Sequence, residues 1–268
     1  MTRTVHLLAI DPQNDFCDLP AAWHSRDPHS GAVTVPALPV PGAHADMQRL
    51  AAFIRAQGAG IDHITVTLDS HQRYDVAHPA YWQRSDGGAV APFTAITAAQ
   101  VRAGAFAPRD PAALARTLDY LDTLETQGRY TLMVWPVHCE IGSWGHGVHT
   151  DVLAACSDWQ AHRVRAVQAE VPDAADPHTT LNTQLLDQLA SADLLLIAGE
   201  ASSHCVRATT EHIIQHLARL HPGWSPRRLV LLTDCMSPVA GFEAQHEAFL
   251  ETMHAQGARL ATSSEICL

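Results

Sequence analysis

Short apolar runs alternate along this chain with longer stretches that have helical periodicity. The runs are rich in leucine and β-branched residues, which is typical of strands buried on both faces of a parallel sheet. The six expected strands begin at Thr4, His63, Tyr130, Asp193, Arg228 and Ala258. The alternation therefore predicts a doubly wound α/β fold: a mainly parallel sheet of about five to six strands with helices on both faces, in three layers (α/β/α).

Helices are expected where apolar residues recur at helical spacing between these runs. They cover residues 45–57, 111–124 and 180–190, the stretch after Cys205, and residues 243–257. Two segments rich in Pro, Gly, His and Ala, residues 17–42 and 73–110, are expected to be long loops. A chain of 268 residues can bury one large core, so we expect a single domain over residues 1–268.

The net charge and the lengths of the apolar stretches restrict the kinds of partner that this chain is expected to bind. A net charge of −11 without a basic stripe argues against nucleic acid. No apolar stretch approaches the roughly 20 residues of a membrane span, and the N-terminus lacks signal-peptide features, so we expect a cytoplasmic protein that binds no membrane. The six scattered cysteines indicate neither a disulfide framework nor a cysteine-rich metal site. We expect a small-molecule substrate, and a homo-oligomer is left open.

A reactive side chain follows each of four expected strands. Asp11 stands in "AIDPQNDF", Asp69 in "TLDSH", His138 in "VWPVHC" and Cys205 in "GEASSHCV". In doubly wound folds ligands bind beyond the carboxyl ends of the strands. One polar residue at a strand end is usually a turn or cap residue, but four such ends are hard to attribute to turn chemistry.

Cys205 is a candidate nucleophile because it stands where a strand meets a helix. The N–H groups and dipole at a helix start favour a thiolate, although most free cysteines are small core residues. Asp11 is the candidate base, with a turn residue as the alternative. Phe16 and Trp135 could form flat walls for a planar substrate, or equally belong to the core.

Asp69, His71, His78 and His138 form a candidate metal site. One carboxylate with three imidazoles suits one divalent ion, such as zinc, manganese or iron. The remaining histidines that lack carboxylate neighbours are expected at the surface: His6, His24, His29, His149, His162, His178, His216, His221, His246 and His254.

The motifs "AIDPQNDF", "TLDSH", "WPVHC", "GSWGH" and "GEASSHCV" occur in that order within residues 4–240. Together they resemble the cysteine-hydrolase branch of the isochorismatase-like superfamily, which includes nicotinamidases. The resemblance implies Asp11 as base and Cys205 as nucleophile. It also implies a cis peptide bond at Glu200–Ala201, which aims the Ala201 N–H, with that of Cys205, into an oxyanion hole. The metal ligands that it implies are Asp69, His71, His78 and His138, with zinc as the leading ion. Among relatives, the number of residues between the ligands equivalent to His71 and His78 varies.

The family triad includes a lysine between "WPVHC" and the cysteine motif, but all 17 basic residues of this chain are arginine. Either the segment is missing, or "HRVRAVQ" is a residual edge strand that puts Gln168 near the lysine position. Arg163 or Arg165 would be the local cation. Without a cation, Asp11 should raise the pKa of the thiol by like-charge repulsion unless it accepts the proton itself.

The favoured hypothesis is a metal-dependent cysteine amidohydrolase that acts through a Cys205 thioester. It would release ammonia or an amine from a small amide, with nicotinamide as the leading substrate. One alternative is a hydrolase of ureido or carbamoyl compounds. The other is a catalytically impaired, ligand-binding relative that lacks the family lysine.

Overall fold

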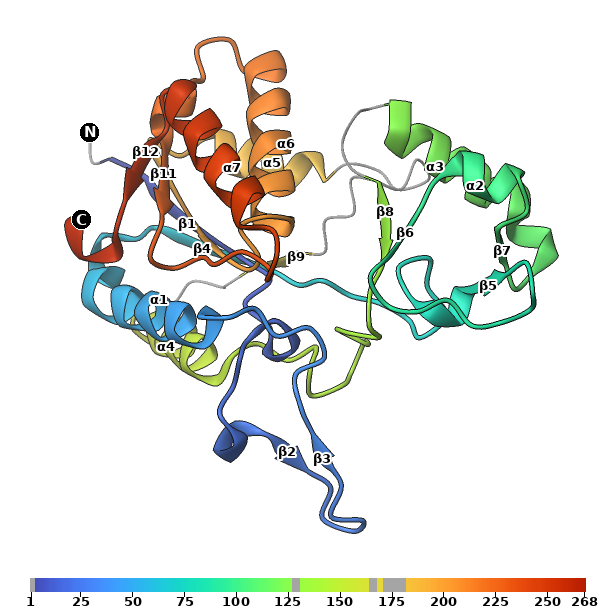
Figure 1. The fold of residues 1–268 in the computed structure, drawn as a ribbon. Coiled ribbons are helices and arrows are strands. Elements are labelled where there is room, and N and C mark those ends of the chain that lie inside the picture. The colour runs from blue at the N-terminus through green and yellow to red at the C-terminus, as the bar shows by residue number, and fades with distance from the viewer. Residues whose placement is uncertain (1–2, 127–130, 164–167, 171–181) are drawn as a thin grey trace. The chain divides into compact units, whose positions relative to one another are not determined.

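The computed structural model describes residues 3–126, 131–163, 168–170 and 182–268 (Figure 1). These residues form two compact units. The first unit contains residues 3–69, 144–163, 168–170 and 182–268, and the second contains residues 70–126 and 131–143. The single domain over residues 1–268 stays a prediction. No helix in the described ranges is long and apolar enough to cross a membrane.

The first unit is built on a six-stranded sheet with the order β12-β11-β10-β1-β4-β9. Every neighbouring pair of strands is parallel. All residues of the two central strands β1 and β10 are buried, as expected for parallel strands covered on both faces. The strands are β1 (Val5–Ile10), β4 (His63–Thr67), β9 (Gln168–Glu170), β10 (Leu194–Gly199), β11 (Leu229–Leu232) and β12 (Arg259–Ala261).

Helices cover both faces of this sheet, which confirms the predicted three-layer α/β/α fold (Figure 1). Helices α1 (Ala43–Gln57) and α4 (Thr150–Arg163) share one apolar core with alternate residues of β1 and β10. Helices α5 (Thr183–Ala190), α6 (Cys205–Leu220) and α7 (Glu243–Ala255) lie on the other face. Helix α4 was not predicted, because its apolar residues show little helical periodicity; its Trp159 is nevertheless buried.

The segment from residue 17 to 42 is not a loop throughout. It contains an antiparallel pair of short strands, β2 (Ser25–Arg26) and β3 (Val33–Thr34), which extends away from the sheet of its unit (Figure 1). Both residues of β3 are exposed, so no apolar alternation marks the pair in the sequence.

A glycine at the end of β10 brings two strand ends together. Gly199 has a φ of 125°, and a Cβ at this position would lie 1.9 Å from the carbonyl oxygen of Ile10. The next residue, Glu200, donates its backbone N–H to the same oxygen at 2.8 Å. The chain that follows β10 is therefore held directly beside the chain that follows β1.

The second unit has its own apolar core around the fully buried Trp82. Its two antiparallel strand pairs are β5 (Trp82–Arg84) with β7 (Phe106–Pro108), and β6 (Thr94–Ile96) with β8 (Leu132–Val134). Its helices are α2 (Ala98–Arg102) and α3 (Leu114–Thr126).

Two predictions for this unit were wrong. The run from Tyr130 forms a strand, β8, but outside the parallel sheet, because it pairs with β6. The segment 73–110 is not a long loop, because it contains β5, β6, β7 and α2.

Candidate active site and metal centre

Asp11 follows β1 directly and is buried. Its backbone N–H donates to Thr67 Oγ1 at 3.1 Å, and the Thr67 hydroxyl donates to Asp11 Oδ1 at 2.6 Å. Burial, followed by the negative charge of Asp69, raises the pKa of the Asp11 carboxyl to about 7, although the hydrogen bond from Thr67 and the nearby Cys205 thiol oppose this rise. Asp11 can therefore exchange a proton near neutral pH.

Cys205 is the first residue of α6, its side chain is partly exposed, and the Asp11 carboxyl is close enough to act on its thiol. Burial, followed by the charges of Asp11 and Asp69, raises the pKa of the thiol well above its ordinary value, and the nearby backbone of Ala201 opposes this rise. The lowering of the thiol pKa expected from the helix start is smaller than the rise caused by burial and by two carboxylates. Cys205 is therefore a thiol beside a base, not the thiolate that the sequence predicts.

The peptide bond Glu200–Ala201 is cis, as the resemblance implies. The turn that follows it is fixed by contacts that the sequence did not reveal. Ser202 donates its N–H to the Ser237 carbonyl at 2.9 Å, and its hydroxyl lies 2.7 Å from His246 Nδ1. Ser203 Oγ accepts the Val239 N–H at 3.1 Å. The loop before α7 and α7 itself thus hold the turn that carries Cys205.

Asp69 belongs to the first unit and follows β4. Gln13, whose side chain is buried, bonds both backbone groups of Asp69: Gln13 Oε1 accepts the N–H at 2.7 Å, and Gln13 Nε2 donates to the carbonyl at 2.8 Å. The second hydrogen of Nε2 reaches the carbonyl of His146 at 3.0 Å. The sequence did not single out Gln13, although it lies in the same motif as Asp11.

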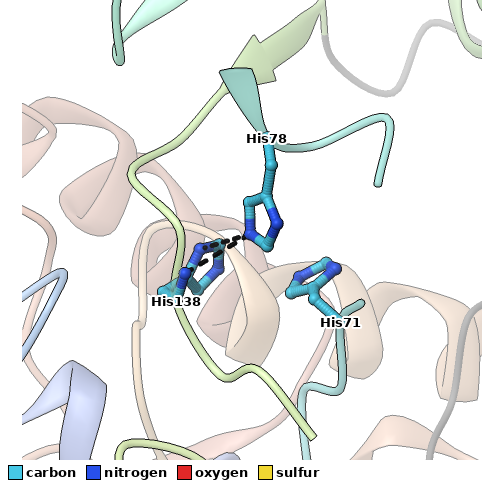
Figure 2. Close-up of side chains that lie close together, drawn as sticks. All are labelled: His71, His78 and His138. Atoms are coloured by element: carbon cyan, nitrogen blue, oxygen red, sulfur yellow. Dashed lines mark hydrogen bonds between the residues drawn. The ribbon is translucent and has the colours of Figure 1, made fainter. Parts of the chain in front are cut away.

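The second unit brings together the three predicted histidine ligands, His71, His78 and His138. One ring nitrogen from each lies within 4.8 Å of the others. The ring centroids are 4.7 Å apart for His71 and His78, 4.8 Å for His71 and His138, and 5.2 Å for His78 and His138. Figure 2 shows the three rings converging. His78 and His138 are buried, and His71 is partly exposed.

The donor set of this cluster fits a divalent ion. Each ring has an oxygen acceptor near its Nδ1, and donation from Nδ1 leaves a lone pair on Nε2. The acceptors are the Asp75 carboxylate for His71 at 3.1 Å, the Gln72 carbonyl for His78 at 3.1 Å, and the Pro136 carbonyl for His138 at 2.8 Å. His78 Nε2 also accepts the His138 backbone N–H at 3.4 Å and lies 3.3 Å from His138 Nδ1. Three imidazoles suit zinc and neighbouring transition metals. The cluster can therefore bind a metal ion.

The two predicted aromatic walls differ in exposure. Phe16, in the first unit, is buried, whereas Trp135, in the second unit, is partly exposed. The backbone N–H of Trp135 donates to the carbonyl of Ala77, the residue before His78, at 2.7 Å. The ring of Phe93, which is 56% exposed and has a φ of 64°, lies edge-on to Trp135 with centroids 5.8 Å apart. No sequence pattern marks Phe93.

A short edge strand, β9, is present in the first unit, and it begins at Gln168, the last residue of the predicted "HRVRAVQ" strand. Gln168 pairs with Thr65 of β4, while Glu170 pairs with Thr67. Arg165 lies outside the described residues, as does the side chain of Arg163. In the described part of the chain, the strongest charges acting on Cys205 are the carboxylates of Asp11 and Asp69.

Two histidines expected at the surface are buried instead. His149 Nε2 lies 2.9 Å from His44 Nδ1, and burial lowers the pKa of His149 to about 4. His6, inside β1, bonds the Thr65 hydroxyl at 2.8 Å, and burial followed by His63 lowers its pKa to about 4. The signal for His6 was its place within a strand covered on both faces.

The fold is that of isochorismatase-like cysteine hydrolases. The structure is similar to the Acinetobacter baumanii nicotinamidase/pyrazinamidase (TM-score 0.61, 18% identity, 98% of each chain covered). It is similar to the yeast nicotinamidase Pnc1p (TM-score 0.61, 17% identity, 96% of this chain and 99% of that one). It also resembles an isochorismatase family protein from Desulfovibrio vulgaris (TM-score 0.50, 16% identity, 98% of this chain and 95% of that one). No protein-family model and no curated protein sequence matches the chain.

Proposed function

We propose that the chain is a metal-dependent cysteine amidohydrolase that acts on a small amide. The observation that carries the proposal is the proximity of the Asp11 carboxyl and the Cys205 thiol, which follow two adjacent strands and act on each other's pKa. A thiol needs a proton acceptor before it can attack a carbonyl. A carboxyl whose pKa is about 7 is suited to accept and return that proton near neutral pH.

The reaction has two halves. Asp11 accepts the thiol proton as Cys205 Sγ bonds to the amide carbon, and the oxyanion is stabilised by the N–H groups of Ala201 and Cys205. Asp11 then returns the proton to the leaving nitrogen, the carbon–nitrogen bond breaks, and ammonia or an amine departs from a thioester. In the second half Asp11 accepts a proton from water, whose oxygen attacks the thioester, and the carboxylic acid leaves as the thiol is restored.

Asp69, His71, His78 and His138 would hold one divalent ion, with zinc favoured over manganese or iron because three imidazoles dominate the set. The bound ion would supply Lewis-acid chemistry, either by polarising substrate or by activating water. Asp69 as the fourth ligand rests on the family resemblance and on its place two residues before His71.

Nicotinamide is the favoured substrate, because two of the similar structures are nicotinamidases. Ureido and carbamoyl compounds are the second choice. The chain would act in the cytoplasm.

A second candidate function is ligand binding without turnover. It is favoured by the two carboxylates that raise the pKa of Cys205, in a chain without lysine.

Ammonia release from a panel of small amides, using protein of verified metal content, separates the two functions. Cys205→Ala should abolish release, whereas Cys267→Ala, a change at an exposed cysteine, should leave it intact. Retention of full activity by Cys205→Ala would reject the thioester mechanism. A wild-type protein that binds metal and nicotinamide but turns over no amide would establish the ligand-binding function instead.

A further inference from the structure

Asp75 joins two of the three histidines of the metal cluster. Its Oδ2 accepts from His71 Nδ1 at 3.1 Å, and its Oδ1 accepts the Ala77 N–H at 2.9 Å. The Asp75 carbonyl accepts the His78 N–H at 2.9 Å. One residue therefore orients the ring of His71 and shapes the turn that presents His78.

The common explanation for such an aspartate is turn formation alone. Asp86 offers a direct comparison within the same unit, because its Oδ1 accepts the Gly88 N–H at 2.9 Å in the same kind of turn. The second oxygen of Asp86 contacts exposed Arg84, whereas the second oxygen of Asp75 contacts a ring of the cluster. The turn accounts for only one of the two oxygens of Asp75.

We propose that Asp75 is a positioning residue for the metal, which holds His71 in the tautomer with the proton on Nδ1. An imidazole that donates from Nδ1 has its lone pair on Nε2, the atom that must bind the ion. A carboxylate behind a ligating imidazole also increases the basicity of that ligand, and loss of such a partner typically weakens metal binding by about 10-fold to 100-fold. This inference rests on the metal site of the proposed function and adds a residue to it.

Asp75→Asn isolates this role from the turn. The side-chain oxygen of the asparagine can still accept the hydrogen bond from the Ala77 N–H, but its NH2 group then faces His71 Nδ1. The ring nitrogen must accept, so the proton moves to Nε2 and blocks the ligand atom. Asp86→Asn is the matched control, because it makes the same chemical change in the same kind of turn without facing a histidine.

The experiment measures zinc affinity of the full-length chain by competition with a chromophoric chelator. We expect Asp75→Asn to bind zinc at least roughly 10-fold more weakly than wild type, and Asp86→Asn to match wild type. Nitrogen-15 NMR of the metal-free protein should show the Nδ1–H tautomer of His71 in wild type and the Nε2–H tautomer in Asp75→Asn, a readout that a purely structural role would not change.

Wild-type affinity in Asp75→Asn, or an unchanged His71 tautomer, would overturn the inference while leaving the metal site intact. If wild type and Asp86→Asn also fail to bind zinc, the metal part of the proposed function fails first and the inference falls with it. The two failures are therefore distinguishable.

Discussion

The pH dependence of Cys205 alkylation tests the pairing of thiol and carboxyl directly. Because Asp11 and Cys205 lie close together and each shifts the pKa of the other, they titrate as a pair. The first proton leaves with a pKa of about 7, and the pair then holds one proton between oxygen and sulfur. This singly deprotonated pair is the form in which the sulfur can attack.

The pKa sets the size of the effect. With a pKa of about 7, the reactive fraction is roughly 0.1 at pH 6 and roughly 0.9 at pH 8, so the alkylation rate rises about tenfold and is then nearly constant up to pH 9. A lone thiol whose pKa lies well above its ordinary value behaves differently, because its thiolate fraction rises about tenfold with every pH unit over this range. Asp11→Asn should show this steep profile without a plateau.

The assay uses brief iodoacetamide pulses on chelator-treated protein, followed by digestion and quantification of the Cys205 peptide. The peptide with exposed Cys267 gives an internal reference in every sample. Asp69→Asn should move the plateau to lower pH, because the charge of Asp69 raises the pKa of Asp11. A wild-type rate that climbs steadily to pH 9 and overlays the Asp11→Asn profile would refute the pairing.

Three further changes have expected outcomes. Asp11→Asn should raise the free energy of unfolding by up to about 4 kcal/mol at pH 8 and by little at pH 4, because a carboxyl with a raised pKa costs stability as pH rises from about 4 through 7; equal gains in urea titrations at both pH values would contradict this. His6→Gln should reduce the loss of unfolding free energy between pH 7 and pH 5 by about 2 kcal/mol, because the unfolded chain binds that proton near pH 6.5 and the folded chain only near pH 4; an unchanged loss would reject the assignment. His71→Ala should remove most of the bound metal in elemental analysis, and an unchanged metal-to-protein ratio would count against the cluster.

The strand ends were predictable from the sequence, because strands that are buried on both faces of a parallel sheet have a recognisable composition. The runs at β1 and β10 are continuous and apolar, and adjacent parallel strands bring the residues after them to one edge, so the meeting of Asp11 and Cys205 follows. The convergence of the three histidines followed from spacing and chemistry. Their roles in catalysis and metal binding stay predictions.

Other features depend on partners distant in the sequence. The run at β8 has the composition of a strand in the parallel sheet. It pairs instead with β6 in an antiparallel arrangement, and β6 lies in a segment whose sequence shows no clear strand pattern. Helix α4 is held by packing, as when Trp159 Nε1 donates to the Gly58 carbonyl at 3.1 Å. The thiol of Cys205 was expected to ionise easily from its place at a helix start, but its pKa depends on burial and on carboxylates from two other strands.

The missing lysine changes how the thiol can be activated. A cation beside Cys205 would favour a resting thiolate, whereas burial and the carboxylates of Asp11 and Asp69 favour a thiol. A resting thiolate is not required if the proton moves as the sulfur attacks, because the charge then passes from Asp11 to the developing oxyanion and is never added to the site. The proximity of Asp11 to Cys205, together with a carboxyl pKa of about 7, is consistent with that route. Under the proposed mechanism, a chain without lysine would depend more heavily on Asp11.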